Sequence, residues 1–167
     1  PEFIRDILLE VGRFTPEDWA QVVKEYEHVR REEAFPLCLG VKDCLEFAKK
    51  EGFFQWVVSN TREADLFMIL RKARISDFFE QWWGYDSHPR SGKKPAPDIY
   101  LSAFEQAALR HPDAVRFLVF EDSALGIEAA VSARLLWSQV PVTVIGVATG
   151  ADDAKNLQAA DRVLSTL

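Results

Sequence analysis

Hydrophobic and polar positions follow one another along the chain in a pattern that predicts alternating helices and strands. The first helix begins at Thr15, because a capping hydroxyl is followed by Pro16 and two acids, and an apolar stripe carries it to about Glu33. Later, continuous apolar runs alternate with amphipathic ones. The predicted strands are 54–58, 82–85, 116–120 and 142–147, with an apolar tail at 163–164; the predicted helices are 41–50, 64–73, one begun by Pro97-Asp98, one ending near Arg134, and 152–159.

Apolar strands separated by helices are typical of an α/β fold. Because the strands lack polar alternation, they are expected to be buried on both faces of a mostly parallel sheet, with helices on each side. In such three-layer sheets, ligands bind outside the carboxyl ends of the strands. The polar clusters of this chain follow predicted strands, so we expect them to gather at that edge.

Composition narrows the classes of partner. The net charge is −6 and the basic residues are scattered, which argues against nucleic acid or an anionic membrane as the main partner. The longest apolar runs, such as 140–148, are too short to cross a bilayer. Cys38 and Cys44 lack metal-ligand spacing and are interpreted as thiols in a reducing compartment. We therefore expect a cytoplasmic protein.

Three polar clusters are candidates for chemistry, and each also has a structural interpretation. Ser59-Asn60-Thr61 follows a predicted strand and could cap the next helix, or could hold a phosphate oxygen with a hydroxyl and helix-terminal N–H groups. Lys93 and Lys94 could be a solvated pair. However, Lys94 precedes two prolines that fix the local backbone, so its ammonium could instead be aimed at a phosphoryl group.

The third cluster, Glu121-Asp122-Ser123, ends the most apolar predicted strand. Asp122 or Ser123 could cap the following helix. Alternatively, the two adjacent carboxylates repel each other and require compensation, for which a hard cation such as Mg²⁺ is the simplest candidate. Each cluster is weak evidence alone, but all three are expected at the same edge of one sheet.

Three sequence strings carry a family resemblance. VVSNT at 57–61, KPAPDIY at 94–100 and FEDSALGIEAA at 120–130 resemble the second, third and fourth motifs of the haloacid dehalogenase superfamily, most closely its β-phosphoglucomutase and pseudouridine-phosphatase branch. The phrase at 36–41 resembles that branch's hinge between cap and core. The resemblance implies a Rossmann-like three-layer core at 36–167 and the remnant of a helical, C1-type cap at 1–35.

The resemblance also implies roles for individual residues. Ser59 and Lys94 are expected to contact the transferring phosphoryl group, with Asn60 nearby as a substrate-binding residue. Asp122 is expected to ligate Mg²⁺, with Glu121 as a second ligand or a partner of the ligands. The implied activity is that of a Mg²⁺-dependent phosphatase or phosphomutase that acts on a small phosphorylated metabolite through an aspartyl-phosphate.

The nucleophile of that reaction has no counterpart in the chain. The first family motif is a strand that ends in Asp-x-Asp, and no two aspartates here stand two positions apart. In the family this strand is central in the sheet. We therefore expect it to come from residues that precede Pro1 or from another chain, and we expect residues 1–167 alone to be inactive.

Two other interpretations are open. The chain could be a non-catalytic family member that serves as a scaffold or a subunit of a complex, for which Trp82 and Trp83 could supply an aromatic docking surface. A dehalogenase acting on carbon–halogen bonds would share the fold. That alternative is disfavoured because Glu121-Asp122 resembles the metal-binding phrase of the phosphatase branches.

Overall fold

The computed structural model describes residues 15–32, 36–87, 92–148 and 153–165, in two compact units, 1–35 and 36–167. In the first unit, helix α2 spans Pro16–Glu32. Its N-terminus is closed by a reciprocal cap: Asp18 N donates to Thr15 Oγ1 at 3.1 Å, and Thr15 N donates to Asp18 Oδ2 at 2.8 Å. The bond from Thr15 N, and then a bond from the Thr15 hydroxyl, lower the pKa of the Asp18 carboxyl.

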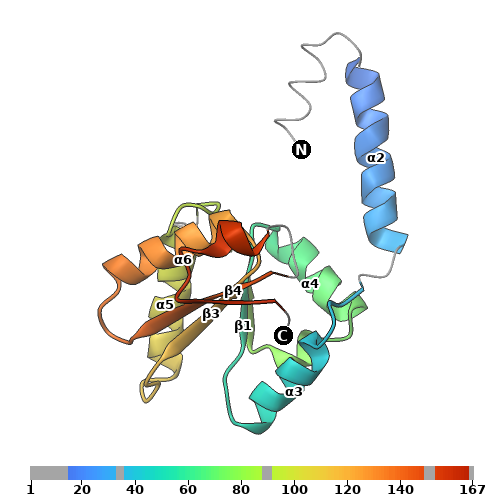
Figure 1. Cartoon of the computed structure of the whole chain (residues 1–167). Helices are drawn as coiled ribbons and strands as arrows, with labels where there is room; N and C mark the ends of the chain where they lie inside the picture. Colours follow the sequence, from blue (N-terminus) through green and yellow to red (C-terminus); the bar gives the residue numbers. More distant parts are fainter. Residues whose placement is uncertain (1–14, 33–35, 88–91, 149–152, 166–167) are drawn as a thin grey trace. The chain divides into compact units, whose positions relative to one another are not determined.

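The second unit alternates helices and strands (Figure 1). In chain order its elements are α3 (Val41–Lys50), β1 (Trp56–Val58), α4 (Glu63–Lys72), the 3₁₀ turn η1 (Ser76–Phe78), β2 (Gln81–Trp83), α5 (Asp98–Arg110), β3 (Phe117–Glu121), α6 (Ala124–Leu136), β4 (Val142–Val147), the 3₁₀ turn η2 (Ala154–Leu157) and β5 (Arg162–Leu164). The predicted α/β class with parallel strands is confirmed, because every strand pair is parallel.

The strands fall into two sheets rather than the single sheet expected from the sequence. β1 pairs with β2, and β3, β4 and β5 form a second sheet in that order. Among the described strands, β1 and β3 are not paired with each other. Ser59 N extends the first ladder by donating to Trp83 O at 2.8 Å, so β2 bonds the end of β1 on the side away from β3.

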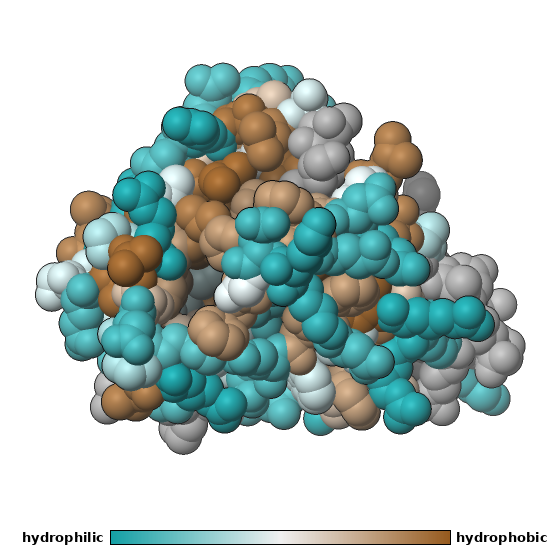
Figure 2. Space-filling view, turned by 90° about the horizontal axis from the view of Figure 1, so that it is seen from below, coloured by the Kyte–Doolittle hydropathy of each residue, from teal (hydrophilic) through white to brown (hydrophobic). Residues whose placement is uncertain are grey.

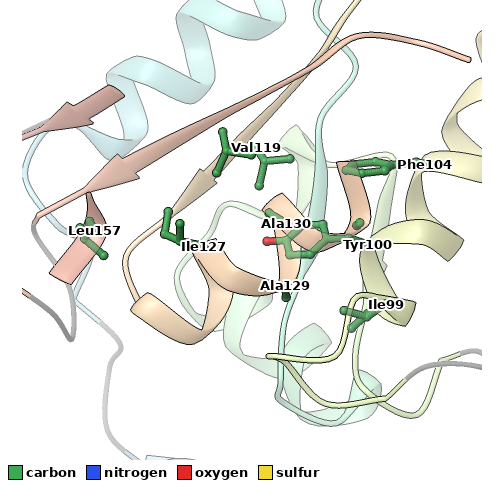
Figure 3. Close-up of a cluster of buried hydrophobic side chains, with 10 residues drawn as sticks. Ile99, Tyr100, Phe104, Val119, Ile127, Ala129, Ala130 and Leu157 are labelled. Atoms are coloured by element: carbon green, nitrogen blue, oxygen red, sulfur yellow. The ribbon is translucent and has the colours of Figure 1, made fainter. Parts of the chain in front are cut away.

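The main core lies on one face of the β3–β4–β5 sheet. Buried side chains from α5, α6, β3, β4 and η2 meet there (Figure 3). Ile99, Ile127, Val144 and Leu157 are its largest fully buried members. On α6, three alanines with no exposed surface let the helix lie close to its neighbours.

A second cluster covers the other side of β1. Leu66 and Leu70 of α4 pack with Ile75, and Val57 of β1 and Leu45 of α3 contact them. The next residue of β1, Val58, packs against the main core instead. Because successive strand residues point to opposite faces, helices cover β1 on both sides.

The β3–β4–β5 sheet is covered less evenly. Val119 is buried under α5 and α6, but its neighbours on the opposite face, Leu118 and Phe120, are 42% and 47% exposed, and Leu164 of β5 is 38% exposed. In Figure 2, hydrophobic side chains reach the surface in several groups between hydrophilic ones. One face of this sheet therefore leaves apolar surface open to solvent.

Several predicted elements need correction. The helix expected at 152–159 is a single 3₁₀ turn within the described part of that segment, in which Leu157 is buried against Gly146. The strand expected from Phe54 begins at Trp56, because β2 offers partners for three residues, and Phe54 instead stacks on His111. The strand expected to end at Phe120 continues through Glu121.

Neither cysteine is in a disulfide: Cys38 is exposed and Cys44 is half-buried. Within the described ranges, no helix has the length and apolar character needed to span a membrane.

Candidate active site

An open pocket of about 340 Å³ lies between the carboxyl ends of β1 and β3. Its lining residues are Val57, Val58, Ser59, Asn60, Lys94, Phe120, Glu121, Asp122 and Ser123. All five residues singled out from the sequence as site residues are in this set. Two of the three polar clusters lie at the ends of strands, and Lys94 lies in the loop before α5.

The Lys94 ammonium is held by three acceptors. It donates to Val58 O at 2.8 Å, to Tyr100 Oη at 3.1 Å, and to Glu121 Oε1, with which it also forms an ion pair. Only 8% of the Lys94 side chain and 7% of the Glu121 side chain are exposed. An ammonium has three N–H donors, so these acceptors match its full donor capacity. A phosphoryl oxygen that binds Lys94 must therefore replace or share one of them.

Tyr100 links the cation to the acid. Its hydroxyl accepts from Lys94 and donates to Glu121 Oε1, and the residue is 4% exposed. Burial, followed by the negative charge of Glu121, raises the pKa of the Tyr100 phenol well above its usual value. The phenol therefore keeps its proton at neutral pH and acts as a donor to the carboxylate.

Glu121 and Asp122 do not share one environment. Glu121 is the last residue of β3 and points to the covered face together with Phe117 and Val119, whereas Asp122 follows the strand and is exposed. A Cβ at position 126 would overlap the Glu121 carboxylate, so Gly126 of α6 leaves the room that this side chain occupies. The compensation expected from a cation is provided for Glu121 by the Lys94 ammonium.

Asn60 contacts the backbone of Lys94 through both ends of its amide. Lys94 N donates to Asn60 Oδ1 at 2.8 Å, and Asn60 Nδ2 donates to Lys94 O at 3.2 Å. These two bonds join residues 34 positions apart and fix the Lys94 segment to the turn after β1. The Asn60 side chain, which was predicted to bind substrate, is therefore hydrogen-bonded to the Lys94 backbone in this structure.

The alternative capping interpretations can now be separated. Ser59 Oγ accepts from Thr61 N at 3.1 Å, which closes a turn rather than a helix end. The first turn of α4 is instead bonded by Asp86, whose carboxylate accepts from Glu63 N at 2.8 Å. Ser123 caps α6 by accepting from Gly126 N at 3.1 Å. Asp122 is thus left at the pocket without the capping role.

The donor set fits Mg²⁺ in part. Asp122 offers carboxylate oxygens at the mouth of the pocket, which is the ligand type that Mg²⁺ prefers. Within the described part of the chain, no cluster of three or more His, Cys, Asp or Glu residues could hold a metal alone. Because Mg²⁺ is commonly held by one or two carboxylates together with phosphate and water, Asp122 could hold it if a further ligand came from elsewhere.

Sequence reasoning missed Tyr100 as a site residue. It lies within the string KPAPDIY, six positions after Lys94. The available signal was its phenol, since a buried hydroxyl needs a hydrogen-bond partner.

Comparisons with known proteins find related sequences and structures. Residues 4–137 match the model of the haloacid dehalogenase-like hydrolases. A curated relative, the "Phosphorylated carbohydrates phosphatase" of Thermotoga maritima, is 31% identical over 124 residues, which cover 74% of this chain and 52% of the relative. The chain therefore spans about half the length of this relative.

Solved structures share the fold. A Thermotoga maritima protein for which a beta-phosphoglucomutase function has been proposed is 26% identical, with a TM-score of 0.70 over 95% of this chain and 70% of its own. A hydrolase of the same family from Deinococcus radiodurans R1, solved with bound phosphate and sodium, is 22% identical, with a TM-score of 0.70 over 95% of this chain and 68% of its own. At that level of identity the second match shows the fold alone.

Proposed function

The chain belongs to the haloacid dehalogenase-like hydrolases, and we propose that it forms part of a Mg²⁺-dependent phosphatase for small phosphorylated molecules. The observation that carries this proposal is the pocket in which Ser59, Lys94 and Asp122 come together at the ends of β1 and β3. A phosphoryl group needs hydrogen-bond donors, a cation and a metal ligand, and these three residues supply them.

We assign the residues as follows. The Ser59 hydroxyl and the N–H groups of the turn after it bind phosphoryl oxygens. The Lys94 ammonium neutralises the charge that develops on the transferring group. Asp122 would hold Mg²⁺, which supplies further charge neutralisation when bound. Glu121 fixes Lys94 rather than serving primarily as a metal ligand, since its carboxylate is already bonded to Lys94 and Tyr100.

The nucleophile is proposed to arrive on an added strand between β1 and β3. Three observations support this: the two strands are not paired with each other, the pocket opens between them, and both contribute side chains to its wall. A parallel strand inserted there would join the two sheets into one. The strand would come from residues encoded before Pro1 or from a partner chain, and it would end in Asp-x-Asp.

The proposed reaction has two steps. The first aspartate of the added strand attacks phosphorus, the bond from phosphorus to the leaving oxygen breaks, and the second aspartate protonates that oxygen. In the second step, water gives a proton to the second aspartate and attacks phosphorus, the bond from phosphorus to the first aspartate breaks, and inorganic phosphate is released. Residues 1–35 are proposed to be part of a helical cap.

The test is hydrolysis of p-nitrophenyl phosphate by the full-length protein, meaning the chain with all residues that its gene encodes before Pro1. We expect turnover that requires Mg²⁺ and that falls to background in Asp122→Asn at every Mg²⁺ concentration, because the variant loses the ligand charge. The matched control is Asp113→Asn, which changes an exposed aspartate before β3 and should keep native turnover.

Undiminished turnover in Asp122→Asn would refute the assignment of Asp122. Absence of turnover in a folded native protein that binds Mg²⁺ would favour the non-catalytic scaffold instead.

A further inference from the structure

The flexible stem of the Lys94 side chain cannot by itself hold the ammonium in one position. A lysine side chain has a flexible four-carbon stem, and holding its head in one place costs conformational entropy. The head is nevertheless inside the protein, with 8% of the side chain exposed. Something must therefore compensate for both the lost freedom and the lost hydration of the charge.

Three contacts could do so, and they differ in kind. Val58 O is a backbone acceptor that belongs to β1. Glu121 is a charged acceptor, but its side chain also has rotatable bonds that must be fixed. Tyr100 is a rigid side chain on α5, packed in the main core next to Phe104, with ring centroids 5.9 Å apart. Of the two side chains that hold the ammonium, Tyr100 is the one anchored by the core.

The Tyr100 hydroxyl is also the group that contacts both charges. It accepts from Lys94 and donates to the same Glu121 oxygen that accepts from Lys94. The ammonium additionally lies over the Tyr100 ring, 4.8 Å from its centroid. Figure 3 shows Tyr100 among the buried side chains contributed by α5 and α6.

We propose that Tyr100 is a positioning residue for Lys94. Its hydroxyl bridges the Lys94 ammonium and the Glu121 carboxylate. Because Tyr100 is packed in the main core, the core determines where the ammonium contacts a phosphoryl group. The catalytic benefit of this positioning rests on the proposed function. The hydrogen-bonded bridge itself can be measured without any turnover. Tyr100 does not contact substrate in this scheme and acts through Lys94.

The test is the ¹H–¹⁵N spectrum of lysine ammonium groups in the full-length protein. Native protein should give a Lys94 resonance whose protons exchange slowly with water, assigned by its loss in Lys94→Met. In Tyr100→Phe, which removes one oxygen and keeps the ring, this resonance should shift and its protons should exchange roughly tenfold faster, the factor expected for the loss of a charge-assisted hydrogen bond.

Tyr85→Phe is the matched control, since Tyr85 lies against the neighbouring Lys93, whose ammonium is 4.5 Å from its ring centroid. It should leave the Lys94 resonance unchanged. An unchanged Lys94 shift and exchange rate in folded Tyr100→Phe would overturn the proposal.

A second measurement guards against a Tyr100→Phe variant that does not fold. In native protein the Tyr100 hydroxyl proton should itself be visible and show a cross-peak to the Lys94 ammonium. Its absence would also overturn the proposal. If the bridge is observed but the protein hydrolyses no phosphate ester, the proposed function fails and the positioning contact stands.

Discussion

At the scale of single residues, the site is organised around Lys94 and not around the paired acids that the sequence brings to attention. The ammonium has three acceptors, and the backbone of the same residue is held by Asn60. A loop lysine thereby becomes a fixed charge. This matters for the proposed chemistry, because a preorganised cation stabilises developing charge without reorganising during the reaction.

Replacement of Asn60 tests this organisation. We expect Asn60→Ala to lower the unfolding free energy of the full-length protein by about 1–2 kcal/mol, since it removes two neutral hydrogen bonds at a partly solvated position. Asn60→Asp retains an acceptor for Lys94 N and should lose less. Urea unfolding of the three proteins measures the difference. Equal stability of native protein and the alanine variant would show that the two bonds contribute nothing.

The orientation of Glu121 marks the limit of sequence reasoning at this scale. The spacing of the polar clusters correctly predicted that Ser59, Lys94 and Asp122 would meet. It did not predict that Glu121 would be paired with Lys94, because the strand was expected to end one residue earlier. Side chains alternate along a strand, and β3 includes one residue more than predicted. Glu121 therefore points to the covered face, whereas Asp122 lies exposed at the pocket.

At the scale of elements, the apolar runs predicted the bounds of some elements well and of others poorly. β4 was predicted with its observed bounds, and α3 also matches. The sequence offered Asp122 and Ser123 as possible caps of the helix that follows β3, and Ser123 caps α6. The segment after β4 was predicted wrongly as a full helix, because its apolar spacing is compatible with either a helix or a turn and tertiary packing of Leu157 selects the turn.

Asp161 shows how a loop residue ties three elements together. Its Oδ2 accepts from Val144 N of β4 at 2.8 Å and from Arg134 NH1 of α6 at 2.5 Å, just before β5 begins. The backbone bond from Val144, and then the bond from Arg134, lower the pKa of Asp161 below its usual 3.8.

A pH dependence follows from that lowered pKa. Because the folded protein prefers ionised Asp161, its contribution to stability is complete above about pH 3.8 and is lost as the pH falls through the lower folded value. Asp161→Asn should therefore be less stable than native protein near neutral pH, and the difference should shrink below pH 3.8. Urea unfolding across this range is the measurement.

The matched control for Asp161 is Asp153→Asn, which changes a carboxylate in an exposed ion pair with Lys155. It should differ little from native protein at any pH, because exposed pairs contribute little. A stability difference for Asp161→Asn that stays constant as the pH falls would contradict the assigned pKa shift.

At the scale of the whole molecule, the two sheets and the pocket between them are the features that most need explanation. Each sheet is parallel, and helices α5 and α6 pack against the larger one and against Val58 of the smaller one. The helical layer is thus continuous where the strand ladder is not. A strand between β1 and β3 would bury four or five apolar side chains at roughly 1.5–3 kcal/mol each, which is comparable to the roughly 5–15 kcal/mol stability of a whole domain.

The family and the α/β class could be predicted from the sequence, because the strings that carry the family resemblance are short, local and fixed in order. The substrate could not, since the resemblance implies that a cap and a loop after the first motif select the leaving group. Of the predicted cap segment, the structure describes α2 alone. What the chain contributes is therefore the phosphate- and metal-handling part of the proposed site.

The most direct test is release of inorganic phosphate from p-nitrophenyl phosphate with Mg²⁺, measured for residues 1–167 alone and for the full-length protein at equal concentration. Background release is expected from residues 1–167, because this sequence contains no Asp-x-Asp, and Mg²⁺-dependent release is expected from the full-length protein. Full activity from residues 1–167 alone would contradict the proposal, as would a folded full-length protein that has no strand between β1 and β3 and yet hydrolyses the ester.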